Sequence, residues 1–472
     1  MNESIISLFI KWAGEPPYKI TPLPRSGSSR KYYRIKSNKH TAIGVENTDR
    51  KENIAFIEFT KHFLNKGIAV PRIYGTDLDN DSYLLEDLGD TTLFSFLTEK
   101  KKSGKFPAKL KNIYKKVLDK LPEIQIKASE GLPYTYCYPR AEFDKQSMMW
   151  DLSYFKYYFL KLAQIEFDEQ ALEDDFQSFT DYLLTADRNY FLYRDFQSRN
   201  IMLKDENIYF IDYQGGRKGA LQYDVASLLY DAKAGIPDDI REELLEHYIL
   251  AVKKHINLDE KKFKDLYYGY VLIRIMQAMG AYGFRGFYEK KAHFLASIPY
   301  AIQNLKGILT KIDLPIQLPT LMDVLNKLVT SERLLEIGRK RKRLTVSINS
   351  FSYKRGIPVD ESGHGGGFVF DCRALNNPGR YEQYKQLTGK DLKVIEFLQK
   401  EEDVQKFINA TKELIDISIN NYLKREFSNL MINFGCTGGQ HRSVFMAEHF
   451  ADYIKNKYNV KVALRHREQE MK

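Results

Sequence analysis

Three oxygen-bearing side chains, Asp195, Asn200 and Asp212, stand at spacings that suit the transfer of a phosphoryl group. A hydroxyl nucleophile needs a nearby carboxylate that orients it and accepts its proton, and Asp195 fits this role. A polyphosphate also needs Mg²⁺, a hard cation that prefers oxygen ligands, which Asn200 and Asp212 can supply. The order, with an apolar stretch over 208–211 before Asp212, predicts a catalytic loop, a short hairpin and a metal-binding carboxylate. Arg199 adds positive charge beside the phosphates.

Each of these residues has a simpler interpretation when it is taken alone. An Asp or Asn in a loop is commonly a turn residue, and Asp212 can merely end a strand. Their joint occurrence in this order favours the phosphotransfer site over a set of unrelated turns. An ATP-dependent kinase that uses Mg²⁺ is therefore the leading hypothesis.

The elements expected around these residues form a small lobe of strands followed by a mainly helical lobe. Strands are expected around 30–46 and 82–86, with an amphipathic helix over 53–65 between them. Pro133 and Pro139 mark a loop that leads into the helical lobe. The helices expected in that lobe cover 110–128, 147–167, 170–185, 223–232, 240–255 and 261–282.

Residues 1 to about 325 resemble the aminoglycoside phosphotransferase family of kinases, and within it the N-acetylmuramate and N-acetylglucosamine anomeric kinases. Besides the catalytic loop, the segments that carry the resemblance are 27–35, 83–90, 143–144, 151–155 and 223–229. The resemblance implies an α+β, bilobal protein-kinase-like domain over 1–325, with a small lobe over 1–90 and a helical lobe over 91–325. It also implies ATP and Mg²⁺ as cofactors and an N-acetylated amino sugar as the substrate.

The same resemblance implies roles for individual residues. Glu86 and Leu88 lie in the segment that links the two lobes, whose backbone would meet the adenine. Asp151 lies in the substrate-lobe helix, where the related sugar kinases usually carry Glu, and Asp224 would brace the catalytic loop. The hairpin that covers the phosphates would contribute Ser26, Gly27, Ser28, Ser29 and Arg30.

Three departures from the family pattern concern the catalytic loop and the small lobe. Tyr193 stands where the family usually has His, and Gln197 stands where the sugar kinases often have a second His. Neither position transfers the proton or binds the metal, so the chemistry is expected to survive. The strand at 41–46 has no Lys where protein kinases place the one that pairs with the phosphates. Arg30, Lys31 or Arg34 can stand in for it, and a solvated hairpin is the alternative.

Arg274 is the one charged residue in the otherwise mostly apolar segment 272–284, which is typical of a buried helix. A charge among apolar neighbours needs a partner or a substrate. A structural ion pair is one answer, and recognition of a sugar or carboxylate is the other. Trp150, Tyr282 and Phe284 can stack on a sugar ring, with ordinary packing as the alternative.

A second site is predicted at 432–443, where an apolar strand leads through a glycine-rich loop into an amphipathic helix. Gly438 and Gly439 let backbone amides turn inward, the helix N-terminus adds partial positive charge, and His441 and Arg442 complete the charge complement. Phosphate is the natural ligand of this predicted cradle, which consists of Cys436, Thr437, Gly438, Gly439, Gln440, His441, Arg442 and Ser443. Cys436 and Arg442 also have the Cys-x5-Arg spacing of cysteine phosphatases, in which a thiolate attacks phosphorus.

Residues 344–472 resemble the C-terminal domain of the RapZ family of RNase adapter proteins, a smaller α/β domain. In that family the domain senses an amino-sugar phosphate and binds small RNAs, so the resemblance implies a phosphosugar sensor rather than a phosphatase. The family's usual N-terminal Walker-type domain is replaced here by the kinase, which weakens the case for RNA as a partner. The segments that match are 350–358, 370–378, 387–389, 435–444 and 466–467.

Two further features of this domain bear on the cradle. Asp371 and Arg373 follow a short apolar strand over 368–370, so they are expected at its carboxyl end, near Cys436. His364 lies in a glycine-rich segment, 363–367, which is expected to be a plain flexible loop rather than a flap that closes over a ligand.

Composition and charge restrict the class of protein. The chain of 472 residues carries a net charge of +10, and half of this excess lies in Arg339–Arg343, within a helix end and basic linker over 326–343. This placement favours a solvated junction over a phosphate-backbone contact. Three cysteines cannot build a disulfide framework, and no signal peptide or membrane-spanning stretch is evident. The protein is expected to be cytoplasmic, with no membrane partner.

The sequence thus predicts ATP-dependent phosphorylation of the anomeric hydroxyl of N-acetylmuramate or N-acetylglucosamine, joined to a phosphosugar-binding domain. Two alternatives remain open. One is a regulatory adapter of RNA or protein, in which the kinase fold is only a nucleotide-responsive scaffold. The other is a kinase of a different small molecule, choline-like or aminoglycoside-like, whose amine would need an acidic pocket, whereas a muramate carboxylate would need a base such as Arg274.

Overall fold

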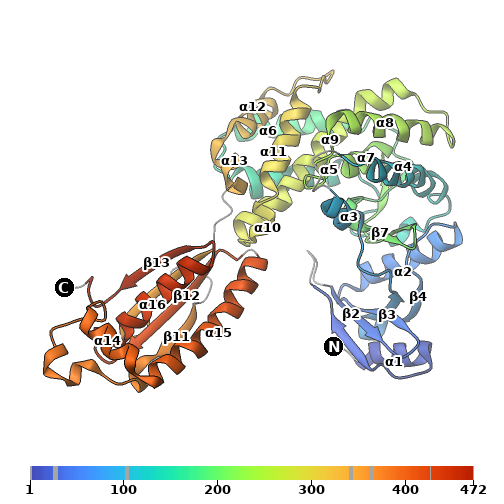
Figure 1. The fold of residues 1–472 in the computed structure, drawn as a ribbon. Coiled ribbons are helices and arrows are strands. Elements are labelled where there is room, and N and C mark those ends of the chain that lie inside the picture. Colours follow the sequence, from blue (N-terminus) through green and yellow to red (C-terminus); the bar gives the residue numbers. More distant parts are fainter. Residues whose placement is uncertain are drawn as a thin grey trace. The chain divides into compact units, whose positions relative to one another are not determined.

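The computed structural model describes residues 3–24, 30–100, 106–339, 344–360, 366–425 and 427–470 (Figure 1). The chain divides into two compact units, Met1–Arg339 and Lys340–Lys472. Four of the predicted phosphate-covering residues, Ser26–Ser29, lie outside the described residues. So do His364 and most of the basic linker, 340–343.

The first unit begins with a five-stranded antiparallel sheet in the order β1-β2-β3-β5-β4. Its two faces are covered by different helices, α1 (Glu3–Ala13) and α2 (Arg50–Asn65). Ala42 faces α1, whereas Ile43 belongs to the core that includes α2, as the alternation of side chains along a strand requires. A Cβ on Gly44 would lie 2.4 Å from Ile5 Cγ2, so α1 can pack this closely only over glycine. The strands are β1 (Lys19–Pro22), β2 (Lys31–Lys36), β3 (Thr41–Glu46), β4 (Ile73–Asp77) and β5 (Ser82–Glu86).

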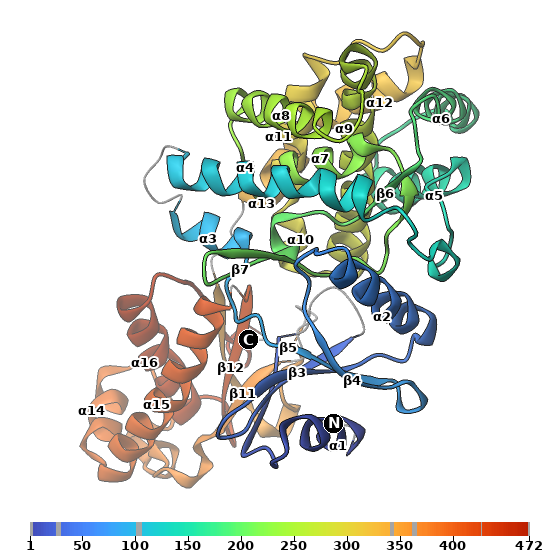
Figure 2. The same ribbon diagram turned by 90° about the vertical axis from the view of Figure 1, so that its right-hand side faces the viewer.

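The rest of the first unit is a helical lobe in which α9 (Glu260–Tyr282) is buried along most of its length and packs against α5 and α7 (Figure 2). This lobe also contains two small two-stranded sheets, β6 with β9 and the β7–β8 hairpin, which lies between β6 and β9 in the chain. The helices are α3 (Leu93–Lys100), α4 (Ala108–Pro122), α5 (Lys145–Phe155), α6 (Glu169–Leu183), α7 (Leu221–Leu229), α8 (Asp238–Lys253), α10 (Ala292–Leu295), α11 (Ile298–Leu309), α12 (Pro319–Thr330) and α13 (Glu332–Arg339). The small strands are β6 (Tyr190–Leu192), β7 (Ile201–Lys204), β8 (Asn207–Phe210) and β9 (Arg217–Gly219).

The expected helices of this lobe are all present, with differences at their ends. The helix expected over 147–167 is too long, because α5 passes into a π-helical turn, Lys156–Leu160, and the chain reverses at Gln164, where φ is +56°. Within the helix end expected after residue 326, Ser331 separates α12 from α13. Helix α1 and strands β1 and β4 were not expected from the sequence.

The second unit is a four-stranded parallel sheet in the order β11-β12-β10-β13. Three helices, α14 (Leu392–Lys400), α15 (Glu402–Lys424) and α16 (Arg442–Lys457), lie on one side of the sheet (Figures 1 and 2). The predicted succession of a bilobal kinase-like domain and a smaller α/β domain is confirmed. The strands are β10 (Thr345–Ser352), β11 (Gly367–Asp371), β12 (Asn429–Cys436) and β13 (Lys461–His466).

A search of the described residues found no helix with the length and apolar character that crossing a membrane requires.

Candidate active site

The predicted catalytic loop follows β6 and is held by a buried carboxylate on α7. Asp224 accepts hydrogen bonds from the backbone amides of Tyr193, at 2.8 Å, and Arg194, at 3.1 Å. Gln125 Nε2 donates a third, at 3.0 Å. Burial raises the pKa of Asp224 to about 7, although these donors favour its charged form. Arg194 has a φ of +81°, so Asp224 holds the residue before Asp195 in an uncommon conformation.

Asp195, Asn200 and Asp212 meet in one place, as their spacing predicts. Asn200 Nδ2 donates to the backbone carbonyl of Asp195 at 2.9 Å and approaches Asp212 Oδ2 at 3.4 Å. A backbone hydrogen bond of 3.0 Å from Ile211 to the carbonyl of Asn200 fixes the two ends of the β7–β8 hairpin together. The carboxylate of Asp195 is about half exposed, so a substrate can reach it.

The chemistry of this donor set fits Mg²⁺. Asn200 uses its amide nitrogen within the protein, which leaves the amide oxygen as a ligand, and Asp212 adds a carboxylate oxygen. Two protein oxygens together with nucleotide phosphates and water are a common way of binding this cation. No group of three or more His, Cys, Asp or Glu suited to a metal occurs among the described residues, so no fuller protein cage competes with this pair there.

Arg30 brings a buried cation to the site, whose 41–46 strand has no lysine. Its side chain is buried, and Nη2 lies 2.9 Å from Asp212 Oδ1 and 3.1 Å from Glu52 Oε1 on α2. The alternative of a solvated hairpin is therefore wrong for Arg30. Lys31, in contrast, is half exposed, and its Nζ lies as far as 3.7 Å from Glu46 Oε2. Such a long ion pair is expected of a surface residue. Glu52 was not recognised from the sequence, and the one signal that could have found it is its place in the first turn of α2.

The segment that links the two lobes is fixed from both sides. Arg34 on β2 pairs with Asp87 at 2.7 Å and with Asp90 at 2.9 Å. Lys204 on β7 donates to the carbonyl of Asp87 at 3.0 Å and pairs with Glu86 at 3.3 Å. Leu88 is buried between these contacts. Both predicted adenine-contacting residues, Glu86 and Leu88, therefore lie on a backbone segment that two cations hold in place.

Two of the predicted substrate-binding residues lie beside the catalytic loop, and the third lies on its surface. Arg274 on α9 is buried, with Nη2 3.8 Å from Asp195 Oδ1. Asp151 on α5 accepts a hydrogen bond of 2.5 Å from Arg194 through Oδ1, while Oδ2 is buried without a hydrogen-bond partner among the described residues. Arg199 is exposed on the turn that follows the loop.

The three aromatic residues considered for sugar stacking have different surroundings. Tyr282 is buried, which supports ordinary packing. Phe284 is half-buried and packs against Tyr158, with ring centroids 5.0 Å apart. Trp150 is 47% exposed and is contacted by the guanidinium of Arg140. Of the three, Trp150 is the most exposed.

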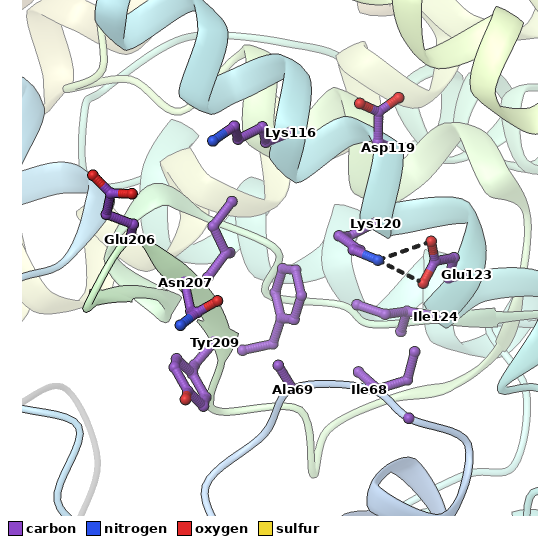
Figure 3. Close-up of a pocket in the computed structure, with 13 residues that line it drawn as sticks. Ile68, Ala69, Lys116, Asp119, Lys120, Glu123, Ile124, Glu206, Asn207 and Tyr209 are labelled. Atoms are coloured by element: carbon purple, nitrogen blue, oxygen red, sulfur yellow. Dashed lines mark hydrogen bonds and ion pairs between the residues drawn. The ribbon is translucent and has the colours of Figure 1, made fainter.

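A cavity of about 510 Å³ lies away from these residues, between α4, the segment 67–69 and the β7–β8 hairpin (Figure 3). Lys116, Lys120 and Tyr209 project from its walls, and Lys120 is paired with Glu123 at 3.1 Å. None of its lining residues is a predicted site residue. The residues expected to do chemistry thus lie at the catalytic loop rather than in this cavity.

In the second unit, backbone amides of the loop between β12 and α16 form the predicted cradle. The amides of Thr437, Gly438, Gln440 and His441 have no hydrogen-bond acceptor among the described residues. The amide of Gly439 donates to Cys436 Sγ at 3.2 Å. Successive free amides at a helix N-terminus attract an anion.

The two basic side chains of the cradle also bind the protein itself. His441 Nε2 lies 2.8 Å from the carbonyl of Tyr384, and Arg442 Nη1 donates to the carbonyls of Arg373 and Leu375 at 2.9 and 2.8 Å. One nitrogen of each side chain is thus engaged by a neighbouring loop, while Arg442 Nε is buried without a hydrogen-bond partner among the described residues. Completion of the charge around an anion by His441 and Arg442 stays a prediction.

Cys436 and Gln440 link the cradle to neighbouring residues. Cys436 is buried, and its Sγ lies 3.1 Å from Ser443 Oγ. Gln440 Nε2 donates to the carbonyl of Leu387 at 2.7 Å. The expected position of Asp371 and Arg373 near Cys436 is confirmed, since Asp371 pairs with Gly435 in the sheet and Arg373 contacts Arg442.

The fold and the site define a kinase-like phosphotransferase with an additional α/β domain. A model of the phosphotransferase enzyme family matches residues 19–258, and a model of the RapZ C-terminal domain matches residues 344–470. The chain belongs to the phosphotransferase enzyme family and carries a RapZ C-terminal domain. Both resemblances expected from the sequence are confirmed.

The curated relatives are similar to part of the chain. A nucleotide-binding protein of Bacillus licheniformis is 41% identical over 128 residues, which are 27% of this chain and 41% of that protein. One from Thermosipho africanus is 37% identical over 177 residues, or 36% of this chain and 60% of that protein. The chain thus spans about two to three fifths of the length of these relatives.

Solved kinase structures are similar to a larger part of the chain at low identity. Choline kinase from Cryptosporidium parvum Iowa II has a TM-score of 0.47 and 11% identity, covering 69% of this chain and 99% of that one. Plasmodium vivax ethanolamine kinase has a TM-score of 0.45 and 14% identity, covering 62% and 82%. The ADP-bound aminoglycoside phosphotransferase APH(2'')-Ib has a TM-score of 0.43 and 12% identity, covering 69% and 99%.

Proposed function

We propose that this protein is a cytoplasmic, ATP-dependent kinase that phosphorylates the anomeric hydroxyl of an N-acetylated amino sugar, N-acetylmuramate or N-acetylglucosamine. The observation that carries the proposal is the meeting of Asp195, Asn200 and Asp212 at one end of the β7–β8 hairpin. A half-exposed carboxylate beside two oxygen ligands is what phosphoryl transfer to a hydroxyl needs. The amino-sugar substrate rests on the resemblance to the anomeric kinases.

Each residue has a role in this proposal. Asp195 orients the sugar hydroxyl and accepts its proton as the new oxygen–phosphorus bond forms. Asn200 and Asp212 hold Mg²⁺, which neutralises the charge of the phosphates when bound. Glu86 and Leu88 present the backbone of the linking segment to the adenine. The hairpin residues Ser26, Gly27, Ser28, Ser29 and Arg30 cover the phosphates, and Asp151, Arg199 and Arg274 face the acceptor.

Arg30 ties the phosphate end of the site to α2. Its contacts with Glu52 and Asp212 place a fixed positive charge next to the proposed metal ligand. Because the guanidinium is buried and paired on two sides, little reorganisation is needed when a polyphosphate arrives. The same contacts connect α2 to the segment after β8 that carries Asp212.

The test is a screen of ATP consumption across N-acetylhexosamines and unrelated alcohols, with phosphorus NMR to locate the ester. We expect turnover with N-acetylmuramate or N-acetylglucosamine and an ester on the anomeric oxygen. Asp195→Asn should lose at least about 100-fold in kcat, since general-base catalysis contributes about 10²–10⁴-fold, while ATP binding is largely retained. Wild-type turnover in Asp195→Asn would remove Asp195 from its role, and turnover confined to choline or an aminoglycoside would overturn the sugar assignment.

For the second unit, we propose that the cradle over 436–443 binds the phosphate of a phosphorylated amino sugar. The support is the row of free amides at the N-terminus of α16. We further propose that the bound phosphosugar modulates kinase output. Calorimetry with glucosamine 6-phosphate should show binding, and an unchanged kinase rate at saturation would count against modulation. Retention of small RNAs in a gel-shift assay over a salt series would favour the adapter function instead.

A further inference from the structure

We infer that Arg274 sets the charge selectivity of the acceptor site: its Nη2 binds an anionic substituent of the acceptor, next to the hydroxyl that faces Asp195. This inference rests on the proposed sugar-kinase function, and it names the residue that recognises the charge of the substrate. Arg274 lies on α9, and its guanidinium is 3.8 Å from Asp195 Oδ1. A group that Arg274 binds is therefore held within reach of the proposed catalytic base.

Two neighbouring side chains fix the orientation of the Arg274 guanidinium. Arg274 Nε donates to Ser227 Oγ on α7 at 2.9 Å, and Nη1 donates to Gln277 Oε1, one turn along α9, at 2.5 Å. Nη2 has no hydrogen bond among the described residues and faces Asp195 at a distance too long for one. A planar, pre-oriented guanidinium with a free edge is suited to a carboxylate. Ser227 and Gln277 are positioning residues in this arrangement.

Several carboxylates around the catalytic loop are engaged by other groups of the protein. Asp151 Oδ1 is paired with Arg194 at 2.5 Å, while Arg194 Nη1 also donates to Tyr223 Oη at 2.8 Å. Asp151 Oδ2 has no hydrogen-bond partner among the described residues. Asp231 is engaged by Ser198 Oγ at 2.6 Å. Asp224 is engaged by the backbone of the catalytic loop.

Two further arginines lie around the catalytic loop. Arg217 is buried close enough to Arg194 that burial and this second cation lower the pKa of Arg217. Arg199 is exposed on the turn after the loop. At Arg274 itself, an ammonium group of the acceptor would be repelled by the guanidinium, whereas a carboxylate would find a partner.

A purely structural role for Arg274 makes a different prediction. If Arg274 only orients Asp195, its loss reduces kcat equally for every acceptor, because the base is common to all of them. If Arg274 binds the acceptor, its loss reduces kcat/KM selectively for the acceptor that carries the anion. The two roles are thus separated by a ratio of specificity constants rather than by activity alone.

N-acetylmuramate and N-acetylglucosamine are a matched pair for this test, since they share the ring and the N-acetyl group and differ by a lactyl ether with its carboxylate. We expect the wild type to prefer N-acetylmuramate. Arg274→Gln should lower kcat/KM for N-acetylmuramate about 10- to 100-fold more than for N-acetylglucosamine, the factor associated with a charge-assisted hydrogen bond. Arg274→Lys should recover part of the preference, and Gln277→Met should show a smaller loss in the same direction.

Arg285→Gln is the control, because Arg285 lies just beyond α9 and is paired with Glu289 at 3.0 Å. Thermal unfolding of each variant shows that the fold is intact. Turnover of both sugars with an unchanged ratio in Arg274→Gln would overturn this inference and leave the proposed function standing. Preference for choline or an aminoglycoside would overturn both. Selective turnover of a carboxylated alcohol other than a hexosamine, lost in Arg274→Gln, would support the inference and overturn the sugar assignment.

Discussion

The carboxylate of Asp224 accepts a hydrogen bond of 3.1 Å from the backbone amide of Arg194, the residue that immediately precedes the proposed base. Arg194 has a positive φ, which a residue with a side chain adopts only when its surroundings impose it. Its guanidinium pairs in turn with Asp151 on α5. One residue of the catalytic loop therefore connects α7 to α5, and the position of Asp195 depends on both helices.

The buried Asp224 makes stability depend on pH. Burial raises its pKa to about 7, above the ordinary value of about 4, so between these values the folded protein holds a proton that the unfolded chain has released. The stability that the folded protein gains from binding this proton more tightly is complete below about pH 4 and is lost as pH rises through about 7. In Asp224→Asn this slope, at most about 1.4 kcal/mol per pH unit, should be absent.

The measurement is the free energy of unfolding of the wild type and Asp224→Asn in denaturant at several pH values from 4 to 8. The variant should also be less stable by about 1.5–3 kcal/mol at neutral pH, because its amide nitrogen meets backbone donors. If the free energy of unfolding changes with pH by the same amount in both proteins over this range, Asp224 does not titrate as stated.

The central part of the site could be predicted because it is local in the chain. Asp195, Asn200 and Asp212 are joined by one turn and one hairpin, so their order along the sequence determines their meeting in space. The pair of Arg30 with Asp212 is different, since 182 residues separate them. No periodicity in the sequence indicates which cation of a hairpin turns inward, and only the packed lobes select Arg30 over Lys31.

The same limit applies to the second unit. The glycines and the strand-to-helix order predicted a cradle of amides, since this depends on neighbouring residues alone. The directions of His441 and Arg442 depend on carbonyls of Tyr384 and Arg373, which lie 57 and 69 residues away in irregular segments. Sequence pattern does not place such segments, so the contacts of these side chains with the protein could not be predicted.

Loss of Arg30 should weaken the use of ATP. Without the guanidinium, Glu52 and Asp212 face the phosphates with uncompensated negative charge. We expect Arg30→Ala to lower kcat/KM for ATP about 10- to 100-fold, as for a charge-assisted hydrogen bond. Lys31→Ala, on the same hairpin but half exposed, should change it less than about 3-fold, in keeping with a surface ion pair. Steady-state kinetics with varied ATP distinguish the two, and equal effects would place Arg30 outside the site.

The proposed metal ligand can be tested by titration with Mg²⁺. Asp212→Asn keeps the shape of the side chain and removes its charge, so half-maximal activity should need at least about 10-fold more Mg²⁺. Asp205→Asn is the matched control, because Asp205 is exposed at the tip of the same hairpin and contributes no ligand. An unchanged Mg²⁺ requirement in Asp212→Asn would exclude this carboxylate as the ligand.

Two adjacent glycines of the cradle should respond differently to alanine. Gly439 has a φ of +67°, and a Cβ there would lie 2.3 Å from Glu468 Cγ and 3.1 Å from the amide of Ser352. Gly439→Ala should therefore cost about 1–2 kcal/mol from backbone strain alone, with a further contribution from the clash. A Cβ on Gly438 meets nothing within 4 Å, and its φ is not positive, so Gly438→Ala should unfold at nearly the wild-type temperature.

The consequence for the ligand follows from the same geometry. Gly439 directs its amide to Cys436 Sγ and so shapes the loop that presents the free amides to an anion. Gly439→Ala should weaken the binding of glucosamine 6-phosphate, measured by calorimetry, while kinase turnover without the phosphosugar is unchanged. Wild-type affinity in Gly439→Ala would mean that the phosphosugar binds elsewhere, since a loop displaced by a few tenths of an ångström cannot offer the same row of donors.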